Sequence, residues 1–246
     1  MTLNPLDLAV FFFAWFFQAF TGFGAGIFIV GILSLLYDPK TVIVSSAVIN
    51  LFGTAFMFAL LLKKVKPRFD ILLLLILGSV PGIFVGAKTL LFIDRETLRV
   101  VIGVFILLLG LYDLLVQRGA LLKFSMRDRA RNSLAVGFVG GFFAGLIGMG
   151  GPPPVVYLNQ VLEDLDEFKT TLTLFFTSNI VFRILFYGIQ GGTEYFSLGL
   201  IYAGAVAIPL GVYLGLLLSR RVRPANLKVF ISISVMVLGA ALVIKP

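Results

Sequence analysis

The 246-residue sequence contains no cysteine and no histidine, and only 13% of its residues are charged. Without cysteine the chain can form no disulfide bond and offers no thiolate for catalysis or metal binding. Without histidine it lacks the commonest metal ligand and general base. Neither a zinc-protease motif nor a nucleotide-binding loop of the Walker type is present. We therefore expect a protein that is not an enzyme and that carries no cofactor.

Apolar residues dominate what remains. They make up 59% of the chain, and the mean hydropathy is +1.07, which predicts an all-α polytopic membrane protein with the lipid bilayer as its surroundings. The net charge of +8 comes mostly from loops, so it indicates orientation in the membrane rather than a nucleic-acid partner. Eight apolar segments have roughly the length that crosses a bilayer core of about 30 Å; they cover residues 5–36, 39–62, 69–92, 97–117, 132–158, 167–190, 195–218 and 225–244.

Glycine and proline interrupt the first and fifth of these segments. The fifth reads Gly148-Met149-Gly150-Gly151 and then has three prolines in a row, Pro152–Pro154, while the first has Gly22, Gly24 and Gly26. A helix-interior glycine costs about 1 kcal/mol and a proline about 3 kcal/mol. Backbone that leaves the helix at membrane depth is tolerated only where protein buries it or where it lines a water-filled cavity. Two such breaks, one in each half of the chain, predict the binding site of a transporter.

The two halves also share a spaced pattern of residues. Gly82 and Gly86 correspond to Gly211 and Gly215 at an offset of 129, while the broken segments correspond at 126. A charged, polar and glycine pattern that is kept at one offset indicates an internal duplication. We predict a first repeat at 1–117, a basic linker at 118–131 and a second repeat at 132–246, each repeat holding one broken segment and three full spans.

Two topologies are compatible with these segments. If the broken segments are re-entrant hairpins, each built from two half-helices of about 10–12 residues, the basic segments 63–68, 118–131 and 220–223 all lie on the cytoplasmic side, as the positive-inside rule requires. The two repeats then have inverted orientations, which is an alternating-access architecture. If all eight segments cross fully, the segment 220–223 lies on the opposite side from the other two and violates the rule.

Arg183 is the most informative single charge, because it lies well inside the apolar segment 167–190. An arginine at the centre of a span costs about 2.5–3.5 kcal/mol on insertion scales, so it usually faces a cavity or a partner. An anionic ligand is one such partner. Snorkelling towards the loop after Gln190 and pairing with an acidic residue are the alternatives.

The remaining candidate ligands lie near the breaks. Helix N-termini at the tips present free amides and a partial positive charge, which suits an anion; the alternative role of the tip glycines is close helix packing. Asn50 and Asn179 occupy corresponding positions in the two repeats, and we expect them to bind a polar solute or polar backbone at the tips; a hydrogen bond between helices is the alternative role. Our predicted substrate-binding residues, besides Arg183 and these two asparagines, are Thr177, Ser178, Gly24, Gly26, Gly150, Gly151, Gln18 and Thr21.

The chain resembles the TauE/SafE family of sulfite and organosulfonate exporters over essentially its whole length. The resemblance rests on the first break (Phe17 to Gly26), the second break (Gly137 to Pro153), the basic linker and the four-element repeat. The resemblance implies transport of small anions across the bacterial inner membrane, with sulfite and C2 sulfonates such as sulfoacetate as substrates. In this chain the first tip has no prolines and the second has three, so the tips are not chemically equivalent.

We expect a secondary transporter that exports a small anion, sulfite or a C2 organosulfonate, by alternating access. A passive anion channel and a membrane scaffold subunit without transport are the alternatives, and a homo-oligomer is compatible with the sequence.

Overall fold

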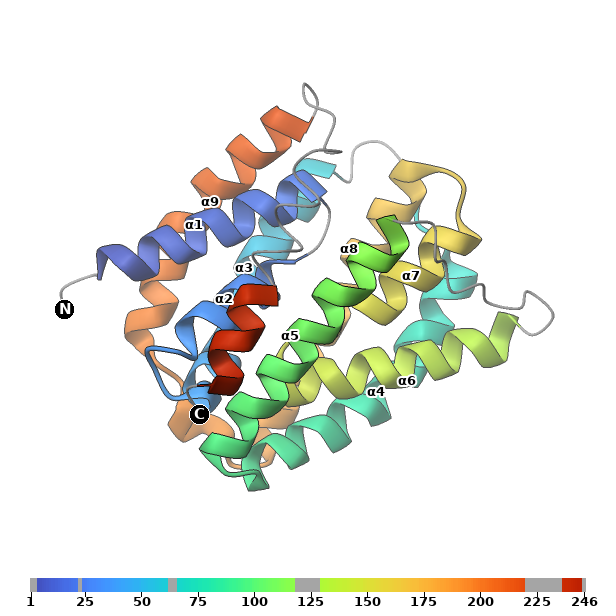
Figure 1. The fold of residues 1–246 in the computed structure, drawn as a ribbon. Coiled ribbons are helices and arrows are strands. Elements are labelled where there is room, and N and C mark those ends of the chain that lie inside the picture. Colours follow the sequence, from blue (N-terminus) through green and yellow to red (C-terminus); the bar gives the residue numbers. More distant parts are fainter. Residues whose placement is uncertain (1–3, 22–23, 62–65, 118–128, 220–235, 245–246) are drawn as a thin grey trace. The chain divides into compact units, whose positions relative to one another are not determined.

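The computed structural model describes residues 4–21, 24–61, 66–117, 129–219 and 236–244. Within these ranges all regular structure is helical (Figure 1), which confirms the predicted all-α class. Residues 236–244 form a last helix. The others are α1 (Pro5–Thr21), α2 (Ala25–Leu33), α3 (Pro39–Leu61), α4 (Phe69–Phe92), α5 (Arg95–Gln117), α6 (Arg129–Ile147), α7 (Pro152–Val161), α8 (Leu165–Ile189), the 3₁₀ helix Gly192–Tyr195 and α9 (Leu198–Ser219).

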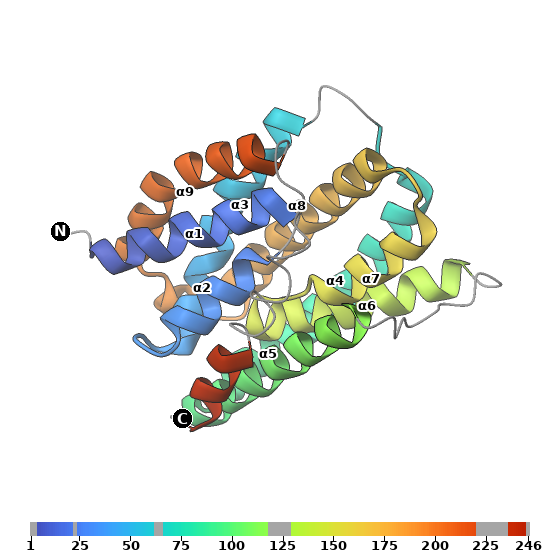
Figure 2. The same ribbon diagram turned by 45° about the horizontal axis from the view of Figure 1, so that its top comes forward.

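The first and fifth apolar segments each form a helical hairpin. In both, the second helix turns back and runs beside the first, as two views of the ribbon show (Figures 1 and 2). The rings of Phe17 and Phe28 stack between α1 and α2 with centroids 5.3 Å apart. Between α6 and α7 the hydroxyls of Ser133 and Tyr157 are 2.8 Å apart and hydrogen-bonded.

The arms of each hairpin are unequal. Helices α1 and α6 have 17 and 19 residues, whereas α2 and α7 have 9 and 10. At 1.5 Å per residue the long arms measure about 25–29 Å and the short arms about 14–15 Å. The expectation of two half-helices of 10–12 residues is therefore wrong for the long arms. Helix α6 is long because it begins at Arg129, in the polar linker, rather than at the start of the apolar segment.

The breaks occur at the predicted glycines and prolines. Gly148 follows α6 with φ +75°, and Gly24 precedes α2 with φ +117°, both in the left-handed region that glycine adopts most readily. Pro152 then begins α7, where a missing backbone donor costs nothing, because the first amides of a helix have no partner within it.

Packing divides the chain into two compact units. Unit 1 comprises residues 1–49, 93–121 and 195–246, and unit 2 comprises 50–92 and 122–194. This division follows contacts, whereas the predicted repeats 1–117 and 132–246 follow sequence likeness. Each unit takes segments from both predicted repeats, and helix α3 contributes to both units.

In unit 1, helix α1 packs mainly against α9. Trp15 of α1 and Val212 of α9 are fully buried. Close approach depends on glycine: a Cβ at Gly211 would lie 2.5 Å from the backbone oxygen of Phe12, and one at Gly215 would overlap the backbone oxygen of Phe16. These two positions on α9 therefore face the α1 backbone directly.

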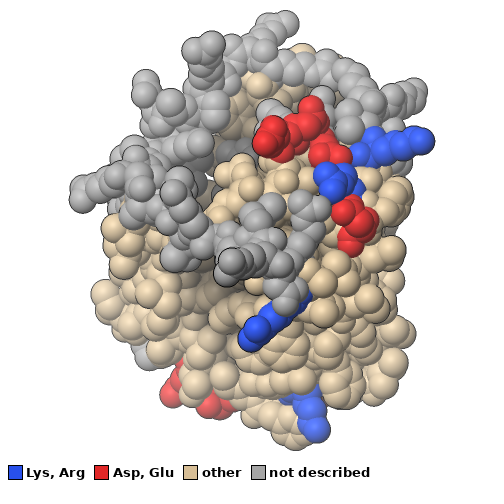
Figure 3. Space-filling model, turned by 90° about the vertical axis from the view of Figure 1, so that its right-hand side faces the viewer, with Lys and Arg blue, Asp and Glu red and all other residues tan. Residues whose placement is uncertain are grey.

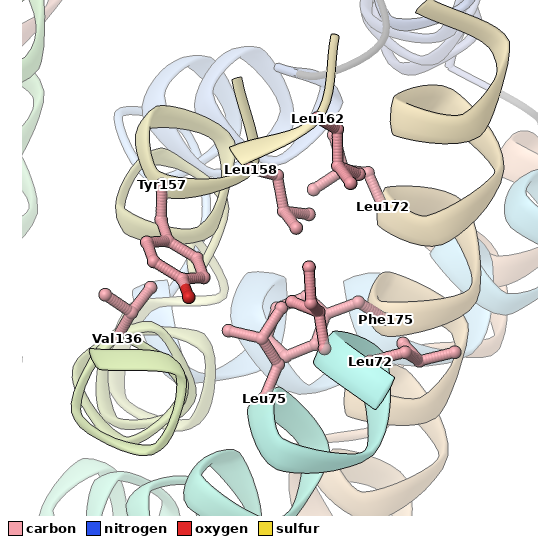
Figure 4. Packing of buried hydrophobic residues seen from close by; sticks show 9 residues of the cluster. Leu72, Leu75, Val136, Tyr157, Leu158, Leu162, Leu172 and Phe175 are labelled. Atoms are coloured by element: carbon pink, nitrogen blue, oxygen red, sulfur yellow. The ribbon is translucent and has the colours of Figure 1, made fainter. Parts of the chain in front are cut away.

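In unit 2, helix α4 packs against α6 in the same manner. A Cβ at Gly82 would overlap the backbone oxygen of Phe138, and one at Gly86 would overlap that of Phe142. The apolar core of the unit lies where α4, α6, α7 and α8 meet (Figure 4); its buried members are Ile71, Leu72, Leu75, Val136, Tyr157, Leu158, Leu162, Leu172 and Phe175.

The starts of α4 and α8 lie together in unit 2. The Arg68 backbone N–H donates to the Thr171 hydroxyl at 3.0 Å, and the Arg68 guanidinium lies 4.0 Å from the Glu167 carboxylate. These contacts join the residue just before α4 to the first two turns of α8, about 100 residues later in the sequence, so α4 and α8 start at the same end of the unit.

Within the described ranges, five helices are long and apolar enough to cross a membrane: residues 39–60, 69–92, 130–147, 167–189 and 198–219. In the view of Figure 3 most of the described surface carries no charge; charged side chains gather at the upper right, and others lie at the lower edge. Most residues of the three basic segments at 63–68, 118–131 and 220–223 lie outside the described residues, so their cytoplasmic placement stays a prediction.

Candidate functional site

Helix α8 brings two of the predicted polar residues together. Asn179 and Arg183 are four residues apart, so they lie on one face of the helix. Their exposed fractions are 3% and 2%. The same face carries the buried apolar residues Phe175 and Leu172, one and two turns before Asn179. A buried guanidinium and a buried amide thus follow the apolar core along α8.

Arg183 is held by the next residue along this face. Its Nε–H donates to the Tyr187 hydroxyl at 3.3 Å, and its Cζ lies 5.6 Å from the centre of the Tyr187 ring, within the range of a cation–π interaction. The Tyr187 hydroxyl in turn donates to the backbone oxygen of Gly145 at 2.6 Å. Because Gly145 belongs to the last turn of α6, this chain of bonds joins the arginine to the segment just before the second break.

Asn179 is oriented from α4. The Ser79 hydroxyl donates to Asn179 Oδ1 at 2.8 Å. Asn179 Nδ2 is buried and has no hydrogen-bond partner among the described residues. An unsatisfied buried donor costs about 1–3 kcal/mol, so this N–H₂ group next to an arginine is well suited to an acceptor-rich ligand such as an oxyanion.

At the second tip, packing accounts for part of the glycine pattern. A Cβ at Gly150 would overlap the backbone oxygen of Gly140 in α6. Gly151 is the N-cap residue of α7, and a Cβ there would meet the Phe176 ring at an ordinary 3.4 Å. Since the three prolines donate no hydrogen bond, the amides near the start of α7 are those of Gly150 and Gly151.

At the first tip, one backbone amide is already hydrogen-bonded to a side chain. Gln18 Oε1 accepts from the backbone N–H of Ala25 at 2.9 Å, and both residues are buried. Gly24 precedes this residue, and Gly26 follows it in the first turn of α2. Thr21 ends α1, and its side chain lies outside the described residues. Gln18 therefore acts as a cap of α2 in this structure, from a position within α1.

The other predicted ligand residues have weaker structural support for a role in binding. The Thr177 and Ser178 hydroxyls donate to backbone oxygens of their own helix, at Thr173 (2.8 Å) and Leu174 (3.0 Å). Thr177 also lies on a different face of α8 from Arg183, because six residues correspond to about 240° of helix rotation. Asn50, in α3, is 7% exposed, and its Oδ1 has no partner among the described residues.

Sequence reasoning missed Tyr187 and Ser79. The spacing of four residues between Arg183 and Tyr187 would have placed the two on one helix face, so that signal was present. Ser79 could not be found in this way, because it reaches Asn179 from another helix, 100 residues away in the sequence.

A buried acid in unit 1 was also missed. Asp7, in the first turn of α1, is 6% exposed, and the Tyr37 hydroxyl lies 3.1 Å from each of its carboxylate oxygens. Asn4 Nδ2 donates to the same hydroxyl at 3.2 Å. The carboxylate was overlooked because it begins an apolar segment, where interfacial solvation is the usual expectation.

These features define a multi-pass helical membrane protein in which two glycine-broken hairpins each pack against a long helix, with a buried arginine beside one of them. Residues 8–242 match the family described as sulfite exporter TauE/SafE. The match covers nearly the whole chain, so the chain belongs to the TauE/SafE family, as its breaks suggested.

One relative is similar to this chain over most of its length. It is the probable sulfite/organosulfonate exporter TauE of Cupriavidus necator strain H16, which is 28% identical over 217 residues, covering 85% of this chain and 80% of that protein. No solved structure is significantly similar to this chain.

Proposed function

We propose that this protein is a secondary transporter that exports a small anion, sulfite or a C2 organosulfonate such as sulfoacetate, across the bacterial inner membrane by alternating access. The family and the name of the Cupriavidus relative support the substrate class. The observation in the structure that carries the proposal is the pairing of a buried guanidinium, Arg183, with the unsatisfied donor of Asn179 on one face of α8.

The charge and donors of this pair fit an oxyanion. A sulfonate or sulfite carries a negative charge and several acceptor oxygens, and a charge-assisted hydrogen bond in a low-dielectric site is about twice as strong as a neutral one. We propose that Arg183 supplies the charge, Asn179 a donor, and the amides of Gly150 and Gly151 further donors. Asn50, Thr177, Ser178, Gln18, Thr21, Gly24 and Gly26 stay predicted ligands.

Equivalent contacts in the two units support the proposed duplication. Gly82 faces the Phe138 backbone in unit 2, and Gly211 faces the Phe12 backbone in unit 1. The two glycines differ by 129 positions and the two phenylalanines by 126, the offsets seen in the sequence. Each hairpin thus packs on the second full span of the other proposed repeat, as expected for an inverted-repeat transporter.

For alternating access, we propose that a hairpin moves against the helices that hold it. In unit 2 this movement would shift α6 and α7 relative to α4 and α8, and so change the path to Arg183. The three basic segments would lie on the cytoplasmic side. No part of this proposal requires a cofactor, a nucleic acid or a second subunit.

Arg183→Ala tests the proposal. Loss of a hydrogen bond to a charged group costs about 1.5–3 kcal/mol, so we expect the dissociation constant for sulfite or sulfoacetate to rise about 10- to 100-fold. Thermal shift of the purified protein against sulfite, sulfoacetate, taurine, acetate and chloride measures binding, because a ligand at 100 times its dissociation constant stabilises by about 2.7 kcal/mol. Flux into proteoliposomes measures transport.

The control is Arg99→Ala, which removes an arginine of unit 1 whose Nε–H donates to the backbone oxygen of Ser34. Unchanged anion affinity in Arg183→Ala would exclude Arg183 as a ligand. Saturable flux with counterflow supports a carrier, whereas flux that never saturates indicates a channel. A folded wild-type protein that responds to no anion would argue for a scaffold subunit.

A further inference from the structure

One fully buried side chain connects the proposed anion site with the second hairpin. Tyr187 is 0% exposed. Its hydroxyl accepts from Arg183 Nε and donates to the backbone oxygen of Gly145, and its ring lies beneath the guanidinium. The two partners belong to different helices, α8 and α6.

The Gly145 oxygen needs this donor because of how α6 ends. The last four carbonyls of a helix have no partner within it. In a regular helix the N–H of Met149 would bond to Gly145, but here it bonds to the backbone oxygen of Phe143 at 3.3 Å. The chain turns at Gly148 instead of continuing the helix. The phenol therefore satisfies a carbonyl that the break itself leaves open.

The guanidinium, in turn, is fixed by the same phenol. An arginine side chain has several rotatable bonds and loses rotamer entropy when it is ordered. The bond from Nε and the ring contact act together on one plane of the guanidinium, which sets the direction of its remaining N–H groups. A lysine has no donor at the Nε position and cannot be held in this way.

We propose that Tyr187 is the positioning residue of the anion site: it fixes the Arg183 guanidinium for the ligand and ties that guanidinium to the end of α6. The inference rests on the proposed anion-transport function. It predicts that the hydroxyl of Tyr187 contributes to anion affinity only through Arg183, and that the position of the hairpin end depends on the same hydroxyl.

Tyr157 is a matched control for the experiment. It is also buried, at 1% exposure, and its hydroxyl is hydrogen-bonded to Ser133 at 2.8 Å within the same unit. Tyr157→Phe and Tyr187→Phe therefore each remove one buried hydroxyl from a tyrosine, and only Tyr187→Phe removes a contact of Arg183. An effect of general destabilisation would appear in both variants.

The experiment is a double-mutant cycle on the full-length protein, with sulfite and sulfoacetate as the probes and dissociation constants measured by calorimetry. We expect Tyr187→Phe to weaken binding about tenfold, the scale of one hydrogen bond to a charged group, and Tyr157→Phe to leave it unchanged. In the Arg183→Ala background, Tyr187→Phe should have no further effect, because residues that act as one unit are not additive.

Equal affinities of Tyr187→Phe and Tyr157→Phe, or full additivity with Arg183→Ala, would overturn the positioning role while leaving the anion site intact. Arg183→Lys gives a second test that keeps the charge and does not depend on the stability of the tyrosine variant; because it loses only the positioning, we expect it to bind about tenfold more weakly than the wild type, as Tyr187→Phe does. Wild-type affinity in Arg183→Lys would show that charge alone suffices. Failure of the wild-type protein to bind any anion would instead refute the proposed function, and with it this inference.

Discussion

Replacement of Gly211 by alanine tests the way in which the hairpins are held. A Cβ at this position would lie 2.5 Å from the backbone oxygen of Phe12, where real Cβ atoms keep at least 3.0 Å. Helix α9 must therefore move away from α1 by about half an ångström in a densely packed interface. Because the obstructing atom belongs to the backbone, no change of side-chain rotamer relieves the contact.

The change in stability that we expect for Gly211→Ala is the sum of two opposing effects. Overpacking of this kind costs about 1–3 kcal/mol, and the fixed backbone places Gly211→Ala in the upper half of that range. The gain in helix propensity returns about 1 kcal/mol. We expect a net loss of about 1–2 kcal/mol, which lowers the melting temperature of a chain of this size by about 2–8 °C.

The assay is thermal unfolding in detergent, with Gly188→Ala as the control. A Cβ at Gly188, in the last turn of α8, would meet no atom within 4 Å, so that variant should show only the gain in helix propensity, up to about 1 kcal/mol, and should be at least as stable as the wild type. If Gly211→Ala melts at the same temperature as Gly188→Ala, the close approach of α9 to α1 does not require glycine at position 211.

Two further predictions concern the first tip and the topology. Gln18→Leu should destabilise the protein by about 1–3 kcal/mol, because it leaves the buried amide of Ala25 without its acceptor, and a melting temperature equal to that of the wild type would refute this capping role. Single cysteines at Lys66 and Glu163 should react with an impermeant reagent from the same side of the membrane, and one at Glu96 from the other side. The absence of native cysteine removes background labelling, and opposite sides for Lys66 and Glu163 would indicate eight full crossings.

The sequence predicted the helices and their breaks well, because both depend on local chemistry. The apolar segments 69–92 and 39–62 agree with α4 and α3 to within one residue, and the two breaks coincide with glycines and prolines that no helix accommodates. The lengths of the arms could not be predicted, since four of the five residues from Arg129 to Ser133 are polar and yet form the first turn of α6. There the helix follows backbone propensity and packing rather than apolar content.

For the candidate site, too, local features could be predicted from the sequence and contacts between helices could not. The sequence predicted that Arg183 lies inside an apolar span, and Arg183 is buried in the structure. What the sequence could not supply were contacts between helices, such as Ser79 with Asn179 and Tyr187 with Gly145. These depend on which helices pack together, and residues about 40 or 100 positions apart carry no mutual signal in a single sequence.

The tip glycines show why the argument for an anion must rest on side chains. Gly150 is required by packing, because a Cβ would overlap the backbone oxygen of Gly140. Gly24 is required by its φ of +117°, although nothing lies within 4 Å of where its Cβ would be. Neither glycine therefore needs a ligand to explain it. Asn179 differs from them, because its buried Nδ2 has no partner among the described residues. Arg183 lies four residues further along the same face of α8, and for these two reasons we propose an anion as the ligand.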